Sequence, residues 1–89
     1  MNLIRSYNDN VVIYPNPLIY SSLISLPENI KQDNNYIDIF NIQGRKVKEL
    51  HVLNNYQITL YRADFNAAGV YFVRIKSDKY LETIKLLVQ

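Results

Sequence analysis

Hydrophobic and polar positions alternate with a period of two along most of the chain after residue 10. In the clearest stretch, Tyr71, Val73 and Ile75 share one face of an extended segment, and the residues between them share the other. Because successive side chains of a β-strand point to opposite faces, this alternation is typical of strands that bury one face. Clusters of Pro, Asn, Asp, Ser and Gly separate these stretches at short intervals, as in sandwiches and barrels. The pattern predicts seven strands, over residues 11–14, 18–26, 36–42, 45–52, 56–61, 70–76 and 79–88.

Individual turn residues refine these boundaries. Pro15 and Pro17 have no backbone N–H group, so they end the first strand and cannot lie inside a sheet. The Ser21–Ser22 pair predicts a bend or bulge within the second strand. Gly44 predicts a hairpin turn with a bulge, because glycine adopts positive φ without strain. Gly69 marks the point where the chain enters the sixth strand, at a place where a side chain would clash.

The connections after residue 52 carry two further signals. The Asn54–Asn55 pair predicts a second tight turn, since Asn tolerates left-handed backbone conformations better than most residues. The connection over residues 62–68 is expected to place Phe65 in the core. Helical periodicity competes with strand alternation only in residues 79–88, where we favour a strand.

Composition agrees with β structure. The chain holds eight Tyr, three Phe, eleven Ile and seven Val but only three Ala among 89 residues, a mixture that favours pleated surfaces over helices. A chain this short forms one domain, and it has no cysteine from which to build a disulfide framework. The expected fold is therefore all-β, a seven-stranded Ig-like Greek-key β-sandwich over residues 11–89, preceded by a polar linker over residues 1–10.

Candidate chemistry is sparse. His51 is the single histidine, and no serine lies in a Gly-x-Ser-x-Gly sequence. Asp33, Asp38, Asp64 and Glu82 could in principle form an acid–base pair, but nothing in their spacing requires any two of them to lie close together. We therefore predict no catalytic, cofactor-binding or metal-binding residue, no cofactor and no enzymatic activity. A net charge of +2 does not predict nucleic-acid binding. No apolar run reaches the ~18 residues of a transmembrane segment, so none is expected.

Two groups of side chains leave alternatives open. Arg45, Lys46 and Lys48 lie on one predicted hairpin, either as a solvated face or as a shallow patch for an anionic partner. The eight tyrosines are divided between the core and the surface, where an exposed row would indicate a sugar platform or a protein-binding site. The alternation does not sort the tyrosines between these roles.

Four segments resemble, in sequence order, the C-terminal sorting domains of the type IX secretion system (Por system) of Bacteroidetes, type A. They are residues 12–17 (VIYPNP), 37–47 (IDIFNIQGRKV), 64–75 (DFNAAGVYFVRI) and 83–89 (TIKLLVQ). The resemblance extends over residues 11–89. The closing segment, residues 83–89, departs from the family pattern, because it carries a single lysine, Lys85, and ends in glutamine rather than in a basic residue.

The resemblance implies a secretion signal rather than an enzyme. Such a domain directs a fused cargo protein through the outer-membrane translocon, and a sortase-like transpeptidase then removes it. The implied partners are translocon components, that transpeptidase and a cargo domain upstream in the same chain, with the cut expected in the linker over residues 1–10. The implied location is the periplasm in transit, then the outer-membrane surface or the medium.

The residues of these segments also have expected physical roles. Tyr71 is expected to bury its ring and to need a partner for its hydroxyl group, as in a tyrosine corner. Recognition is expected on an exposed terminal strand that a receptor extends by β-augmentation, with Lys85 as a charged contact. The alternative function is an Ig-like accessory or adhesion module that binds a glycan or a partner protein. The structural motif residues are Pro15, Asn16, Pro17, Gly44, Gly69 and Tyr71, and the candidate recognition residues are Lys79, Thr83, Lys85, Leu86, Leu87, Val88 and Gln89.

Overall fold

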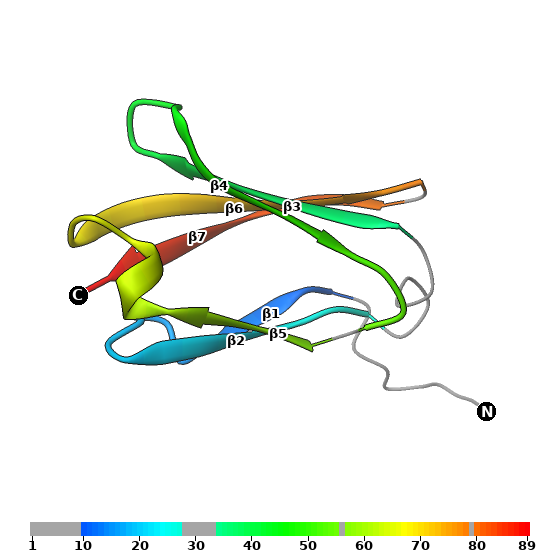
Figure 1. Cartoon of the computed structure of the whole chain (residues 1–89), viewed down its shortest axis with the longest axis horizontal. Helices are drawn as coiled ribbons and strands as arrows, with labels where there is room; N and C mark the ends of the chain where they lie inside the picture. Colours follow the sequence, from blue (N-terminus) through cyan, green and yellow to red (C-terminus); the bar gives the residue numbers. More distant parts are fainter. Residues whose placement is uncertain (1–9, 28–33, 56, 79) are drawn as a thin grey trace.

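The computed structural model describes residues 10–27, 34–55, 57–78 and 80–89. Their strands form two antiparallel sheets that pack face to face (Figure 1). One sheet has three strands in the order β1-β2-β5, and the other has four in the order β4-β3-β6-β7. The elements are β1 (Val12–Tyr14), β2 (Ser21–Ser25), β3 (Asn35–Asn41), β4 (Lys46–Val52), β5 (Gln57–Tyr61), the 3-10 helix η2 (Arg62–Asp64), β6 (Gly69–Ser77) and β7 (Tyr80–Val88).

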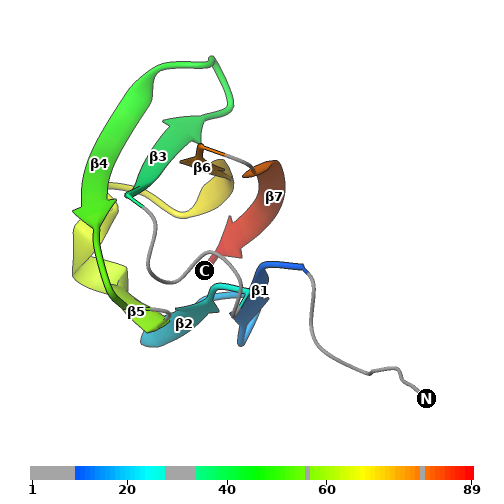
Figure 2. The ribbon, with the colours of Figure 1, turned by 90° about the vertical axis from the view of Figure 1, so that its right-hand side faces the viewer.

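Strands that are distant in sequence pair at the centre of each sheet. β2 pairs with β5, and β3 pairs with β6, so the chain crosses between the sheets within each pair. This arrangement is typical of Ig-like Greek-key sandwiches. β1 and β7 lie at the sheet edges on one side of the sandwich, and β4 and β5 lie on the other side (Figure 2). The predicted all-β, seven-stranded sandwich is confirmed.

The core lies between the two sheets and is built from alternate strand residues. Ile37 and Ile39 of β3 point inward together with Val73 and Ile75 of β6, and all four are fully buried. Burial of each aliphatic side chain contributes about 1.5–3 kcal/mol to folding. Phe65 is also buried, at 5% exposure, as the sequence predicted. The buried side chains with at most 1% exposure include Leu18, Ile24, Ile37, Ile39, Leu60, Val73, Ile75, Leu86 and Val88.

The second strand differs from the prediction. β2 begins at Ser21 rather than at residue 18, because the backbone of Leu18 pairs with β7 instead of with β5. The expected bend or bulge at Ser21–Ser22 is wrong, since both residues pair in unbroken register with β5. A register shift occurs instead between Ile39 and Phe40, opposite β4. The segment before β2 therefore lies outside the three-stranded sheet, and it contributes the fully buried side chain of Leu18 to the core.

The turns follow the sequence signals. Gly44 has φ +83° in the β3–β4 hairpin, where its N–H group donates to the carbonyl oxygen of Asn41 at 2.9 Å. Asn54 has φ +57°, in the segment that carries the chain from β4 in one sheet to β5 in the other. The peptide bonds before Pro15 and Pro17 are both cis. No helix among the described residues is long and apolar enough to cross a membrane.

Candidate functional site

The terminal strand β7 presents a row of side chains on the outer face of the four-stranded sheet. Leu81, Thr83, Lys85 and Leu87 are exposed, with Leu81 at 66% and Leu87 at 37%. The alternate residues point inward, and of these Leu86 and Val88 are at most 1% exposed. The candidate recognition residues therefore fall into two groups, an outward row and a pair that belongs to the core. Of the other two candidates, Gln89 is exposed and Lys79 lies outside the described residues.

Side-chain and backbone groups from the start of the domain cover the free edge of β7. The side-chain amide of Asn16 donates from Nδ2 to the carbonyl oxygen of Lys85 at 2.9 Å. Its Oδ1 accepts from the backbone N–H group of Leu87 at 3.0 Å. A strand added at this edge would make the same two contacts with a peptide group. We call this pair of hydrogen bonds, between Asn16 and the backbone of Lys85 and Leu87, the Asn16 clasp.

Leu18 continues the coverage of this edge. Its backbone N–H group donates to the carbonyl oxygen of Leu87 at 2.7 Å, and its carbonyl oxygen accepts from the N–H group of Gln89 at 2.9 Å. Arg62 holds the same end, because its Nε donates to the backbone oxygen of Gln89 at 2.7 Å. The expected open edge for β-augmentation is therefore wrong over residues 85–89, where other parts of the domain already pair with it.

The structural motif residues beside β7 occupy the corner where β6 begins. Gly69 has φ +146°, and no atom lies within 4 Å of the position where a Cβ would sit. The reason for glycine there is backbone conformation, so the expected side-chain clash is wrong. The buried Tyr71 donates its hydroxyl hydrogen to the carbonyl oxygen of Ala67 at 2.7 Å, which confirms the predicted need for a partner. Its ring packs against Phe65 at 4.8 Å between centroids.

One carboxylate is buried on the outer face of the same sheet. Asp38 is only 6% exposed, and its Oδ2 accepts from Nη2 of Arg74 at 3.0 Å. Nζ of Lys46 lies 3.3 Å from Oδ1, and the Arg74 guanidinium also lies over the ring of Phe40, at 4.9 Å. Burial alone is the largest influence and raises the pKa of Asp38, but the hydrogen bonds and positive charges of Arg74 and Lys46 together outweigh it and hold that pKa below its ordinary value.

The predicted basic hairpin is partly neutralised by these contacts. Lys46 pairs with Asp38 and lies 3.8 Å from Glu49, and Lys48 lies 3.4 Å from Asp64. The Lys46–Glu49 pair is exposed and contributes about 0–1 kcal/mol. Two of the three basic side chains are thus committed to carboxylates of the domain, which favours a solvated face over a patch for an anionic partner.

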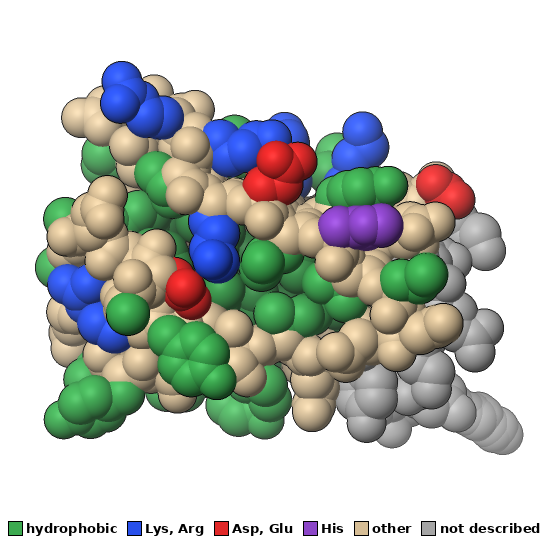
Figure 3. Space-filling model, in the orientation of Figure 1, with side chains coloured by type: hydrophobic (Ala, Val, Ile, Leu, Met, Phe, Trp, Pro, Cys, Tyr) green, Lys and Arg blue, Asp and Glu red, His purple; other side chains and the backbone are tan. Residues whose placement is uncertain are grey.

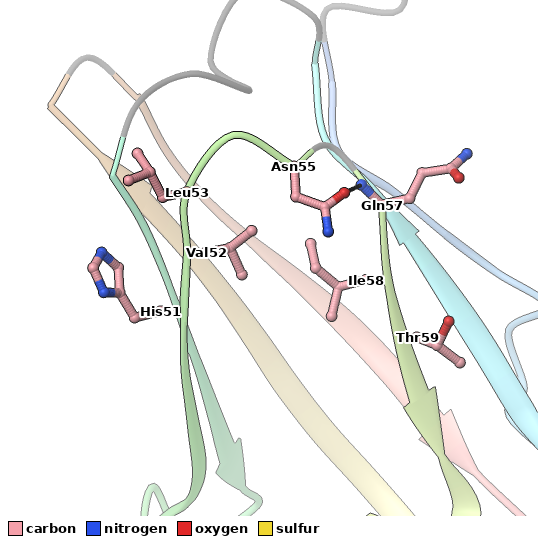
Figure 4. A pocket seen from close by; sticks show the side chains of 7 residues that line it. All are labelled: His51, Val52, Leu53, Asn55, Gln57, Ile58 and Thr59. Carbon is pink, nitrogen blue, oxygen red and sulfur yellow. Dashed lines mark hydrogen bonds between the residues drawn. The ribbon is translucent and has the colours of Figure 1, made fainter.

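A shallow hollow lies between the edges of β4 and β5. Figure 3 shows apolar side chains inside it, and the imidazole of His51 lies at its rim, stacked on the ring of Tyr36 at 4.6 Å between centroids. In Figure 4, Val52 and Ile58 point into the hollow, whereas His51 points away from it. The residues that line the hollow are mixed, since Val52, Leu53 and Ile58 are apolar and His51, Asn55, Gln57 and Thr59 are polar, and none of them is Asp, Glu, Lys or Arg. Among residues 10–27, 34–55, 57–78 and 80–89, no cluster of His, Cys, Asp or Glu could hold a metal ion.

Sequence reasoning missed the functions of Leu18 and of the Asn16 side chain. Both contacts join residues about 70 positions apart, and the alternation of hydrophobic and polar residues does not indicate which distant segments pair. A physical signal for Asn16 was nevertheless present. Between Pro15 and Pro17, which have no N–H group, its side-chain amide and its own peptide group are the only sources of a hydrogen-bond donor.

The comparisons with known proteins agree with this architecture. The family described as the secretion system C-terminal sorting domain matches residues 12–89. The fold is similar to a solved structure of PorZ, described as an essential bacterial surface component of the type IX secretion system of Porphyromonas gingivalis, with a TM-score of 0.70 and 22% sequence identity. The alignment covers 91% of this chain and 12% of that protein's chain. No curated protein matches the chain.

The family match spans nearly the whole described domain, from β1 to the residue after β7. It contains the corner at Gly69 and Tyr71 and the terminal strand that the Asn16 clasp covers. This family consists of sorting signals that direct secretion and carry out no catalysis themselves. The chain belongs to the secretion system C-terminal sorting domains, the Por-type tails of the type IX system.

Proposed function

We propose that the type IX outer-membrane translocon recognises this sorting domain through the outer face of β7. The observation that supports the proposal is the row formed by Leu81, Thr83, Lys85 and Leu87, which is exposed along the full length of the strand. Lys85 supplies a charge at its centre, and the two leucines supply apolar contact on either side of it. A receptor that reads this face needs no rearrangement of the domain.

Face recognition also assigns different roles to the candidate residues. Leu86 and Val88 act through the core, since a receptor cannot reach side chains that are at most 1% exposed. Thr83, Lys85 and Leu87 are the contacts. Deletion of the last ten residues would remove both groups together, so it would abolish secretion by unfolding the domain whether or not β7 is recognised. Side-chain substitutions on the outer face separate the two effects.

The finer steps of the proposal concern the region before β1. The compact domain begins at Val11, which is 5% exposed and whose N–H group donates to the hydroxyl oxygen of Tyr80 and to Oε1 of Glu82. Cleavage within the buried, hydrogen-bonded part of the domain would require that part to open, and residues 1–10 are mostly polar in sequence. We therefore place removal by a sortase-like transpeptidase within residues 1–10, between the domain and a cargo upstream. The cargo would cross the periplasm and end on the outer-membrane surface or in the medium, as for a type A sorting domain.

The test uses a fluorescent reporter that folds in the periplasm, fused between an inner-membrane export signal and residues 1–89 and expressed in a Bacteroidetes host. The variant combines Thr83→Asp, Lys85→Glu and Leu87→Ser. Because the row is exposed, we expect an unchanged melting temperature for the purified domain and at least a tenfold loss of reporter at the cell surface.

The matched control combines Val12→Ser, Gln57→Glu and Thr59→Asp on the outer face of the three-stranded sheet, where all three residues are exposed. It makes a similar change in polarity and charge, and we expect it to leave delivery at the wild-type level. Equal delivery of both variants would contradict recognition through β7. Failure of the unmodified domain to deliver the reporter would instead contradict the sorting function itself.

A second candidate function rests on the outer face of the three-stranded sheet. Tyr14 and Tyr61 are 53% and 58% exposed there, and Tyr20, directly before β2, is 85% exposed. Exposed tyrosines are typical of sugar- and protein-binding surfaces, which favours the accessory or adhesion alternative. Tight glycan binding that is lost in a Tyr20→Ser and Tyr61→Ser double variant, with delivery of the reporter unaffected, would support this second function.

A further inference from the structure

We propose that Asn16 prevents the terminal edge of β7 from pairing with the same edge of a second copy of this chain. The inference goes beyond the sorting function, since it concerns how two free domains meet. It starts from the backbone groups of β7 that point away from β6. The contacts of Lys85, Leu87 and Gln89 show that the odd-numbered residues direct their N–H and C=O groups outward.

An unpaired strand edge is a template for another strand. Among the described residues, the outward backbone groups of Leu81 and Thr83 make no such pairing, whereas those of Leu87 are occupied by the Asn16 clasp and by Leu18. The edge of β7 thus consists of an open first half and a covered second half. Five outward backbone groups are left without a partner among the described residues, those of Leu81 and Thr83 and the N–H group of Lys85, and this edge is too short for stable addition of a strand.

The edge sequence suits self-pairing if the cover is removed. If the β7 strands of two copies pair antiparallel about Ile84, the residues whose backbone groups point away from β6 lie opposite one another, as strand pairing requires. Leu81 of one copy then lies opposite Leu87 of the other, and Thr83 lies opposite Lys85. Leu81 and Leu87 are both exposed in the single domain, so their contact would bury apolar surface.

The covered half prevents this arrangement. Each open residue of one copy would have to pair with a residue of the other copy whose backbone groups already bond to Asn16 or Leu18. The side-chain amide of Asn16 is suited to this role because it supplies a donor and an acceptor to β7, as a peptide group does. Unlike a strand, it has no second row of backbone groups with which a further strand could pair. The flanking Pro15 and Pro17 have no N–H group, so the segment itself ends the ladder.

The test compares the 89-residue chain with Asn16→Ala and Asn16→Asp by sedimentation velocity over a range of concentrations. Asn16→Asp keeps the size of the side chain but places an oxygen opposite the carbonyl of Lys85. We expect the wild type to sediment as a monomer. Asn16→Ala should dimerise as concentration rises, because it frees the carbonyl oxygen of Lys85 and the N–H group of Leu87, so that only the carbonyl oxygen of Leu87, held by Leu18, is withheld from the pairing. Asn16→Asp should dimerise more weakly, because its carboxylate can still accept from the N–H group of Leu87. The matched control is Asn66→Ala, an exposed asparagine in the η2–β6 connection for which the structure shows no hydrogen bond, and it is expected to stay monomeric.

Amide hydrogen exchange provides the second measurement, at concentrations where every variant is monomeric. In the wild type, the Leu87 amide should exchange more slowly than the outward Thr83 amide. Loss of the clasp in Asn16→Ala should speed exchange at Leu87 about fivefold, with a smaller change at Gln89, which Leu18 still holds. Folded, monomeric Asn16 variants would overturn the proposal, and so would equal exchange of Leu87 and Thr83 in the wild type, a result that needs no variant to fold.

Discussion

Substitution of Tyr71 by Phe isolates the hydrogen bond at the corner before β6. The change removes the hydroxyl that donates to Ala67 at 2.7 Å and leaves the ring against Phe65. A hydrogen bond of this kind contributes about 1 kcal/mol net, and the exposed position of Ala67 allows water to reach the released carbonyl. We expect Tyr71→Phe to lower the free energy of unfolding by about 1 kcal/mol. With an unfolding entropy of roughly 2.1 cal/mol/K per residue, that change lowers the melting temperature by about 5 °C.

Equilibrium unfolding in urea, followed by far-ultraviolet circular dichroism, measures this change directly. The matched control is Tyr20→Phe, which removes the same hydroxyl from a side chain that is 85% exposed and should alter stability by less than about 0.5 kcal/mol. A Tyr71→Phe variant as stable as Tyr20→Phe would refute the reasoning. A loss of about 3–5 kcal/mol, the range for removal of a whole aromatic ring, would refute it as well, since the ring would then not be held in place by its packing.

Two further predictions concern single residues. Gly69→Ala should destabilise the domain by about 1–3 kcal/mol in urea unfolding, because φ +146° strains any side-chain-bearing residue. Gly69→Val should cost a similar amount, since no atom lies within 4 Å of the Cβ position, and a cost confined to Val would mean that crowding of its further atoms is the cause. The lowered pKa of Asp38 predicts that its ion pairs stabilise the fold fully above the ordinary value of 3.8 and that this contribution is lost as pH falls through the lower pKa of the folded state. Asp38→Asn should therefore unfold with a weaker pH dependence below pH 4, and identical pH profiles for the variant and the wild type would contradict the assignment.

The strands were predictable because the alternation of hydrophobic and polar residues indicates which face of each strand is buried. Ile37 and Ile39, or Tyr71 and Val73, are separated by a single residue, so their common orientation can be read from adjacent positions. The positive φ of Gly44 and the burial of Phe65 were accessible for the same reason, since each depends on local conformation or hydrophobicity. These features are properties of short segments, and the structure retains them.

Features that depend on which strands meet could not be read in this way. Asp38 lies on an outward face by alternation, yet the register that places Arg74 opposite it, with Lys46 beside it, buries the carboxylate. Leu18 continues an apolar stretch and was assigned to the second strand, but its backbone pairs with β7, whose position depends on the order of the whole sheet. The recognition residues on β7 remain a prediction, while the covered state of the strand's edge required the three-dimensional structure.

The parallel bridge between Leu18 and Val88 has a mechanical consequence. Tension applied to the domain through its first and last described residues would slide the segment after β1 along β7 rather than peel the two apart. Under such shear, the bonds from Leu18 to Leu87 and Gln89 and the two bonds of Asn16 bear the load together. Resistance to pulling is set by the unfolding rate, so a few contacts that must break at once can hold a small domain folded against a force.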